Sequence, residues 1–502
     1  MEKKRETWSW RGAFVFAVIG SAVGLGNAWR FPYVVAQNGG GAFFIPYLFA
    51  LLTAGIPLMM LEFGIGHKYL GAPPIAYGRA KKDAEMVGWW GVGAAFVIIT
   101  YYGVVMAWAI NYLYHAFTLA WGTDTTSFFL FDFLKLSDGP GILGSLNMPI
   151  LAAYVIGWIL ICWIIYSGVK GLGKVVMVTA TLPVVILIIL ALRGLTLNGA
   201  MAGLDYYLSP NFAALGNVKV WMAAYGQVFF SLSLGMAVLI AYASYLPKDA
   251  EISNNVFIAS LADAGIAFLA GFAIFSTVGY MAAERGTTVA EVAGGGGIGL
   301  AFFVYPQAIN LLPGATFFGI LFFLLLVTLA VDSQFSLVEG IVGSVMDKWN
   351  MKRGTALACV AIPGFLIGLV YVTSGGLYWL DIIDKFVNSY GLVAVGLAQC
   401  IVVGWIIGPD KIREHVNALS EIKVGKWFDF FIKYLTPVVL IYILISSLIT
   451  DLKVPYEGYP GWALNVGWAM VVLLPVGSFL LSKLKTSKET EAAYSEETNI
   501  SA

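Results

Sequence analysis

Along the chain, the first residues that could bind a small solute lie in an apolar run at residues 12–36. The middle of this run, 20–32, carries three glycines, an Asn and an Arg. Each glycine costs roughly 1 kcal/mol in a helix interior, and a helix broken at membrane depth survives only where it lines a cavity or holds a ligand. The stretch therefore predicts a binding site made of unwound backbone, with a flexible transmembrane helix as the alternative.

A second interruption, at 231–235, lies within the apolar stretch 221–236. Paired interruptions in corresponding positions of two halves are typical of inverted repeats with a binding site at the membrane midplane. The amino ends of half-helices favour a carboxylate there, and freed carbonyls favour cations. For this second stretch the alternative is a helix softened by Ser and Gly.

Acidic side chains also occur inside apolar stretches, at Glu62, Asp263 and Asp332. Charges in lipid are costly and are functional candidates by default, although a structural bond to a neighbouring helix is the alternative for Glu62. Because oxygen ligands suit hard cations, we predict two sodium sites. One would use Asn27, Ser231 and Asp263, and the other Asp332 and Ser333.

The composition gives the class of protein that must position these groups. The chain has 502 residues, of which 59% are hydrophobic and 12% charged, with a mean hydropathy of +0.82. These values indicate a polytopic membrane protein. The formal net charge of +0 gives no case for nucleic-acid binding. Cys162, Cys359 and Cys400 lack metal or redox spacing. The scattered histidines argue against a membrane enzyme, and the lack of a continuous polar pore argues against a channel.

Apolar runs predict twelve spans, at 11–36, 41–66, 88–121, 148–167, 174–192, 220–245, 253–281, 314–346, 354–373, 377–407, 428–450 and 461–482. Most Lys and Arg residues then fall on the side of the N-terminus, so both termini are predicted to be cytoplasmic. The segment 408–427 is predicted to contain a short cytoplasmic helix, and 282–313 to form an external lid.

Several motifs resemble the neurotransmitter:sodium symporter family, in particular its bacterial amino-acid transporters. They lie at 20–32, 38–43, 227–235, 241–245 and 329–334, and the resemblance covers roughly residues 1–450. It implies an all-α membrane protein with twelve transmembrane helices, a five-plus-five inverted repeat with helices 1 and 6 broken, and two extra C-terminal helices. The implied divisions are a cytoplasmic segment 1–10, a core 11–407 with repeats at about 11–192 and 220–407, helices 11 and 12 at 428–482, and a disordered cytoplasmic tail 486–502.

The resemblance also implies a role for individual residues. The first sodium would bind Ala22, Asn27, Ser231, Asp263 and the substrate carboxylate, and the second Gly20, Val23, Leu329, Asp332 and Ser333. The substrate carboxylate would meet Leu25, Gly26 and Tyr102, its amino group Ala22, Phe230, Ser231 and Ser233, and its side chain Ile98, Tyr102, Phe230, Met236 and Leu337. The outer gate would be Arg30 with Asp384, and the inner gate Arg5 with Asp347, near Trp8 and Tyr245; Glu62 would support the broken sixth helix. Ordinary interfacial charges are the alternative for the gates.

Departures within the family suggest the substrate. Gly24 stands where the monoamine carriers have Asp, which leaves room for a substrate that brings its own carboxylate. The apolar pocket and the flexible Met236 favour neutral hydrophobic amino acids, aliphatic and aromatic. Asp263 replaces an Asn of many family members, and Ala267 stands where chloride-dependent members carry Ser. The resemblance therefore implies chloride independence.

We therefore expect a sodium-coupled amino-acid symporter that works by alternating access and is no enzyme. A proton-coupled carrier of similar fold is the alternative. The expected location is the bacterial inner (plasma) membrane, as a multi-pass protein in the lipid bilayer, with a homodimer contact at the last two helices.

Overall fold

The computed structural model describes residues 6–293 and 297–487. Over this part of the chain it is built from helices, with two isolated bridges, Gly40–Pro210 and Leu146–Thr373, and no strand. The prediction of an all-α protein is confirmed. Arg5 and most of the predicted disordered tail, 488–502, lie outside the described residues.

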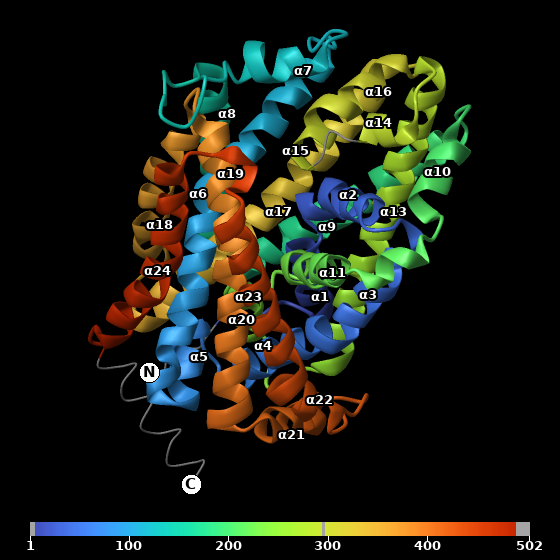
Figure 1. Ribbon diagram of the computed structural model, residues 1–502. Helices are drawn as coiled ribbons and strands as arrows, with labels where there is room; N and C mark the ends of the chain where they lie inside the picture. Colours follow the sequence, from blue (N-terminus) through green and yellow to red (C-terminus); the bar gives the residue numbers. More distant parts are fainter. Residues whose placement is uncertain (1–5, 294–296, 488–502) are drawn as a thin grey trace.

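The first half of the chain forms ten α-helices, with short 3-10 and π-helical segments between some of them (Figure 1). They are α1 Arg11–Ala22, α2 Phe31–Gln37, α3 Phe44–Ala50, α4 Ile56–Lys68, α5 Pro73–Ala80, α6 Glu85–Ala116, α7 Thr125–Ser127, α8 Met148–Tyr166, α9 Gly168–Leu195 and α10 Ala200–Leu208. The π-helical turn η1 Gly26–Arg30 is part of the first helix break described below.

The second half forms fourteen more α-helices within the described residues. They are α11 Val218–Ser231, α12 Val238–Ala243, α13 Ser253–Arg285, α14 Val289–Ala293, α15 Gly297–Gly299, α16 Tyr305–Leu311, α17 Ala315–Trp349, α18 Arg353–Gly368, α19 Gly376–Phe386, α20 Val393–Ile401, α21 Pro409–Leu419, α22 Trp427–Phe430, α23 Thr436–Lys453 and α24 Gly461–Lys483. The π-helical turn η9 Val387–Leu392 joins α19 to α20. The predicted helix within 408–427 is confirmed as α21.

Ten helical segments of the described chain are long and apolar enough to cross a membrane, and the bent pair Arg11–Ala22 and Gly26–Gln37 makes an eleventh. The predicted span 220–245 is divided into α11 and α12, each too short to pass the same test. The chain is therefore a multi-span membrane protein, while the count of twelve spans stays a prediction.

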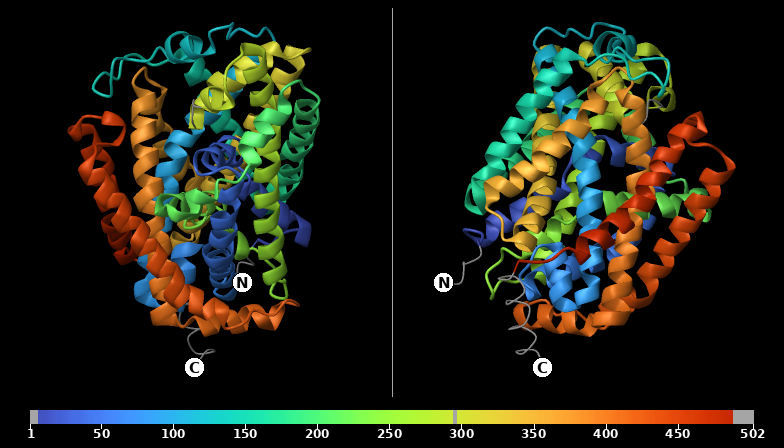
Figure 2. Two further views of the ribbon diagram at one scale, coloured as in Figure 1. Left: turned by 45° about the vertical axis from the view of Figure 1, so that its right-hand side comes forward. Right: turned by 90° about the vertical axis from the view of Figure 1, so that its left-hand side faces the viewer.

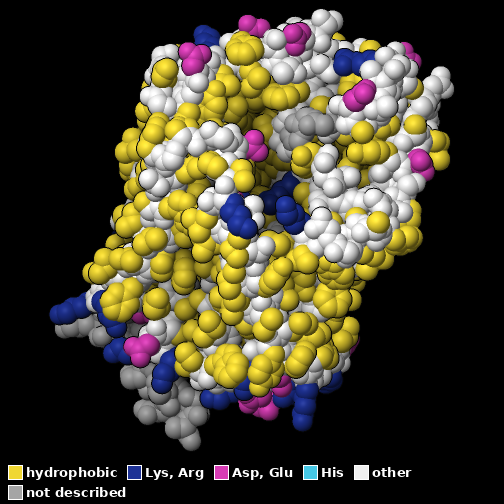
Figure 3. Space-filling model, viewed as in Figure 1, with side chains coloured by type: hydrophobic (Ala, Val, Ile, Leu, Met, Phe, Trp, Pro, Cys, Tyr) yellow, Lys and Arg dark blue, Asp and Glu magenta, His cyan; other side chains and the backbone are white. Residues whose placement is uncertain are grey.

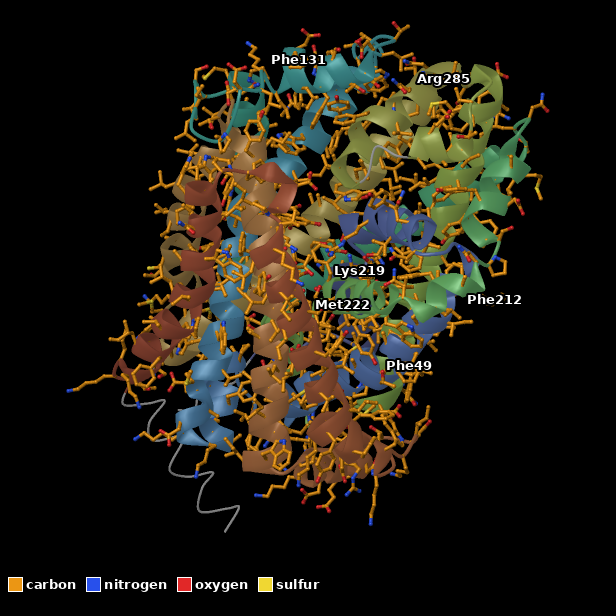
Figure 4. All side chains as sticks on the ribbon, viewed as in Figure 1. Phe49, Phe131, Phe212, Lys219, Met222 and Arg285 are labelled. Atoms are coloured by element: carbon orange, nitrogen blue, oxygen red, sulfur yellow. The ribbon has the colours of Figure 1, made fainter. Side chains whose placement is uncertain are left out.

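The helices form one bundle with two distinct ends. The short helices α7, α14 and α16 lie at one end, called the α7 end below, and α5, α21 and α22 lie at the other, the α21 end; the turned views agree (Figures 1 and 2). Hydrophobic side chains cover much of the face in Figure 3, charged ones lie toward its two ends, and Lys and Arg side chains also gather near its middle. Arg285 and Phe131 are both at the α7 end (Figure 4).

Burial separates a central core from peripheral helices. The most apolar window of Gly41–Lys68 is 72% buried and that of Lys82–Ala116 is 78% buried. The windows of Trp427–Gly458 and Gly461–Lys483 are each only 22% buried. The last two spans are therefore peripheral to the buried central helices.

Both helix interruptions predicted from the sequence are present. The pair α1 and η1–α2 is bent by 52° after Ala22. The segment 232–237, between α11 and α12, includes three residues in the left-handed region, Ser233 (φ 54°), Gly235 (φ 73°) and Ala237 (φ 66°). Because residues other than Gly seldom adopt this backbone conformation, it persists only where surrounding contacts hold it.

Candidate binding site between the broken helices

A small cavity lies between the two breaks, with α6 and α17 completing its wall. It is lined by Ser21, Ala22, Gly24, Leu25, Gly26, Asn27, Ile98, Tyr102, Phe230, Ser231, Ser233, Met236, Ser333 and Leu337. This lining contains every residue predicted to bind substrate and no acidic or basic side chain. Its volume of about 30 Å³ is close to that of one water molecule, so the walls must separate to admit an amino acid.

Glycines let the first helix approach its neighbours around this cavity. A Cβ atom at Gly24 would lie 2.7 Å from Ser333 Oγ, and one at Gly26 would lie 2.5 Å from Phe230 Cε1. A Cβ atom at Gly20 would lie 1.9 Å from Asp332 Oδ2. Side chains at these positions would collide with the groups that line the site.

Three polar side chains predicted for the first sodium are bonded to one another. Asn27 Nδ2 donates to Asp263 Oδ1 (2.6 Å) and to Ser231 Oγ (3.1 Å), and Ser231 Oγ donates to Asp263 Oδ2 (2.7 Å). Asn27 Oδ1 accepts from Gly24 N (3.1 Å). All three side chains are buried. A cation here could be held by the oxygens of this cluster once the Asn27 amide turned its oxygen inward.

The residues predicted for the second sodium lie at the end of α1 and on α17. Asp332 is 1% exposed, and neither of its carboxylate oxygens has a hydrogen-bond partner among the described residues. An ionised carboxylate in such surroundings is costly without a counter-charge. The site therefore fits a cation, with Gly20 in contact with Asp332, and Leu329 one helical turn before it on α17.

Hydrogen bonds hold the two breaks together. Ser233 Oγ donates to Ser21 O across them (3.0 Å). Glu62, which is 0% exposed, accepts from Gly235 N (2.8 Å) and from Gln399 Nε2 (2.8 Å) through Oε1. Glu62 thus contacts the sixth-helix break as expected. Gln399 was missed by the sequence reasoning, because nothing nearby in the chain links it to Glu62.

The predicted outer gate residues do not form an ion pair in this structure. The Arg30 guanidinium lies 4.6 Å from the centre of the Phe230 ring and pairs with no described carboxylate. Asp384 Oδ1 accepts instead from Tyr101 OH (2.7 Å) and Asn388 Nδ2 (2.8 Å). The spacing of four residues between Asp384 and Asn388 is a signal that could have identified this contact from the sequence.

The predicted inner gate is described in part. Asp347 Oδ2 accepts from Ala72 N (2.8 Å), while its predicted partner Arg5 lies outside the described residues. Trp8 and Tyr245 are in contact, since Trp8 N donates to Tyr245 O (3.1 Å), and their place near the inner gate stays a prediction.

Three charged residues at the α21 end were missed by the sequence reasoning. Arg353 pairs with Glu339 (2.6 Å) and with Glu6 (2.9 Å), and Tyr245 OH donates to Glu339 Oε1 (2.9 Å). Glu339 is 1% exposed. This network connects the start of the chain, the segment after α12, and α17 with α18. Its members are far apart in sequence, so no local pattern predicts it.

A second hollow is an open groove of about 750 Å³ beside the start of α11. It is lined by Ala213, Gly216, Asn217, Val218, Lys219, Met222, Tyr442 and Ser446. Lys219 and Met222 are labelled in Figure 4 at this position. Unlike the cavity between the breaks, it is open to the surroundings and gathers no group of cation ligands.

Two broken helices that face each other across a small cavity, with candidate cation ligands beside it, define a membrane transporter of small solutes. Comparison with known proteins specifies the family. The model of the sodium:neurotransmitter symporter family matches residues 5–127 and 121–487, and the chain belongs to this family. It is thus a secondary transporter and not an enzyme, and the family implies sodium as the co-transported ion.

Individual relatives match along almost the whole chain. An uncharacterised sodium-dependent transporter of Methanocaldococcus jannaschii is 42% identical over 97% of this chain and 99% of its own. The sodium- and chloride-dependent GABA transporter 2 of Mus musculus is 34% identical over 97% of this chain and 88% of its own. The human sodium- and chloride-dependent taurine transporter is 34% identical over 93% of this chain and 83% of its own.

Proposed function

We propose that the chain imports neutral hydrophobic L-amino acids, aliphatic and aromatic, together with sodium and without chloride. The observation that carries this proposal is the lining of the central cavity. Its apolar side chains, Ile98, Phe230, Met236 and Leu337, and its lack of charge suit a hydrophobic side chain. The substrate carboxylate would be bound by the Leu25 and Gly26 amides and by Tyr102.

Two sodium ions would bind beside the substrate. The first would replace the mutual hydrogen bonds of Asn27, Ser231 and Asp263, and the substrate carboxylate would complete its shell. The second would neutralise Asp332, whose oxygens lack hydrogen-bond partners in the described chain. Asp332→Asn is expected to abolish sodium-driven uptake, and unchanged sodium dependence in this variant would contradict the second site.

Chloride independence follows from the charge of Asp263. This buried carboxylate supplies a fixed negative charge beside the first sodium, and Ala267, one turn further along α13, offers no hydroxyl to an anion. Uptake should therefore continue when gluconate replaces external chloride. Loss of uptake in gluconate would refute this role of Asp263.

Transport would proceed by alternating access. Substrate and sodium would draw the broken helices together, and Arg30 would then move from the Phe230 ring to Asp384 to close the α7 side. Opening of the Arg5–Asp347 contact would release the solutes at the α21 end. By the distribution of Lys and Arg, the α21 end and both termini would be cytoplasmic, in a bacterial inner membrane.

The peripheral helices α23 and α24 leave a surface at which a homodimer could form. Light scattering of the detergent-solubilised protein would measure the mass of the particle. A mass that corresponds to one chain would rule out the dimer.

Uptake of radiolabelled tryptophan into proteoliposomes tests the function directly. An inward sodium gradient should drive accumulation, and unlabelled leucine should compete whereas glycine should compete weakly. The rival is a proton-coupled carrier of similar fold, for which a proton gradient would drive uptake in sodium-free buffer. That result would refute sodium coupling.

A further inference from the structure

The gate residue Asp384 has an acidic neighbour with an unexpected set of contacts. Asp381 lies three residues earlier on α19, so the two carboxylates occupy successive turns of the same side. Asp381 accepts from Tyr456 OH (3.0 Å) and from Tyr459 OH (2.9 Å). Both tyrosines come from the turn between α23 and α24, outside the helices that enclose the cavity.

The conformation of this turn directs both phenols to one carboxylate. Glu457 (φ 48°) and Gly458 (φ 68°) are both in the left-handed region, which reverses the chain between Tyr456 and Tyr459. Glu457 is strained in this conformation, and such residues persist where the surrounding contacts over-determine them. The contact with Asp381 is therefore a specific feature of the turn.

A second carboxylate next to the turn contacts α19 and η9. Asp451, at the end of α23, accepts from Tyr390 OH (2.6 Å) and pairs with Lys385 Nζ (3.3 Å). Lys385 directly follows Asp384, and its ammonium group also lies 5.2 Å from the centre of the Tyr456 ring. These contacts hold the positive charge of Lys385 on the side of α23.

Apolar packing reinforces the same junction. Ile382, Phe386 and Tyr390 form a buried cluster with Ala463 and Leu464 of α24, separate from the main core. A Cβ atom at the neighbouring Gly467 would lie 2.1 Å from the Phe386 ring, so α24 approaches α19 closely. These contacts join the last two helices to α19, which carries the gate carboxylate, and to η9, which follows it, while α24 also packs against α6.

We propose that the segment 451–459, called the outer brace below, fixes the position of α19 so that Asp384 can meet Arg30 when the binding site closes. Asp381, Asp451, Tyr456 and Tyr459 would be positioning residues of the outer gate. The π-helical turn η9 begins three residues after Asp384, and such turns are frequent at functional sites. The proposal gives α23 and α24 a part in transport, and it rests on the proposed gate role of Arg30 and Asp384.

The test removes two hydroxyl groups and keeps the rings. Tyr456→Phe/Tyr459→Phe abolishes the bonds to Asp381, while Tyr442→Phe, at a half-exposed tyrosine of α23, is the matched control. The first measurement is the rate at which labelled tryptophan leaves the sodium-loaded protein, in the wild-type and in the Asp384→Asn background. The second is hydrogen–deuterium exchange of residues 376–392 in the ligand-free protein, which needs no substrate.

With two bonds to a charged acceptor lost, we expect tryptophan to dissociate about tenfold faster from the double variant. The Asp384→Asn background should show no further acceleration, because the brace acts through that residue, and exchange at 376–392 should rise in the double variant but not in Tyr442→Phe. An unchanged dissociation rate of tryptophan in the double variant would overturn the proposal. So would an equal acceleration by the double substitution in the Asp384→Asn background.

If the wild-type protein binds no tryptophan in sodium, the proposed function fails. Hydrogen–deuterium exchange of residues 376–392 then tests the outer brace without any substrate. A rise confined to the double variant supports it, and unchanged exchange refutes it.

Discussion

Replacement of Glu62 tests how the break in the sixth helix is held. Glu62 is fully buried and accepts two hydrogen bonds of 2.8 Å through Oε1, from Gly235 N and Gln399 Nε2. Glu62→Met keeps the length of the side chain but leaves both donors buried without a partner. Each such donor costs about 1–3 kcal/mol, so the held conformation of the break should lose about 2–6 kcal/mol.

This loss should appear as weaker binding. If the cavity binds substrate only while the break is held, a loss of about 2 kcal/mol lowers the fraction of binding-competent protein about 30-fold. The apparent affinity for substrate falls by the same factor when that fraction is small. Glu62→Gln should stay within about threefold of the wild type. Its amide oxygen can accept from Gly235 N, and its amide nitrogen can donate to Gln399 Oε1, which has no partner among the described residues.

Equilibrium binding of labelled tryptophan in sodium, measured with both variants, distinguishes hydrogen bonding from charge. Met60→Leu, a change at a fully buried neighbour on α4, is the control for packing. Wild-type affinity in Glu62→Met would refute the reasoning. A loss in Glu62→Gln as large as in Glu62→Met would show that the negative charge of Glu62, and not its hydrogen bonds, is what matters.

Three further predictions concern other parts of the molecule. Gly24→Ala should weaken the apparent sodium affinity of uptake about tenfold, because the new methyl group would displace Ser333; an unchanged sodium titration would contradict it. Arg353→Met should lower stability by about 3–5 kcal/mol in thermal unfolding, because the Glu339 carboxylate stays buried without a counter-charge, and Glu339→Gln in the same chain should restore most of the loss. Burial and nearby basic groups lower the pKa of His415 to about 4, against about 6.5 when unfolded. Because the folded chain binds this proton less readily, stability should fall as the pH drops from about 6.5 to 4, and His415→Gln should flatten that part of the melting-temperature profile.

The local pattern of the sequence identified the helix breaks because their cause is local. Glycines at 20, 24 and 26 weaken the first helix, and α1 does end at Ala22. The Ser and Gly residues at 231–235 weaken the sixth, and α11 ends at Ser231. Buried carboxylates were identified as well, since Asp263 and Asp332 stand in apolar runs where only a specific role offsets their cost.

The partners of these groups were less predictable. The bond between Glu62 and Gln399 spans 337 positions of the chain, and that between Arg353 and Glu6 spans 347. A hydrogen bond depends on the distance and direction of two atoms, and neither is written in residue spacing when the partners lie on different helices. The family resemblance gave Arg30 and Asp384 as partners, yet the structure has Arg30 over Phe230 and Asp384 on Tyr101.

The sequence alone thus determined that the chain crosses a membrane, where two of its helices break, and which side chains carry the candidate chemistry, because hydropathy and helix propensity act over short stretches. Only the tertiary structure decided how closely the walls of the cavity approach, which atoms hold the breaks and how the turn between α23 and α24 meets α19. These features arise from side chains that meet across helices, and packing fixes them only once the whole bundle has assembled.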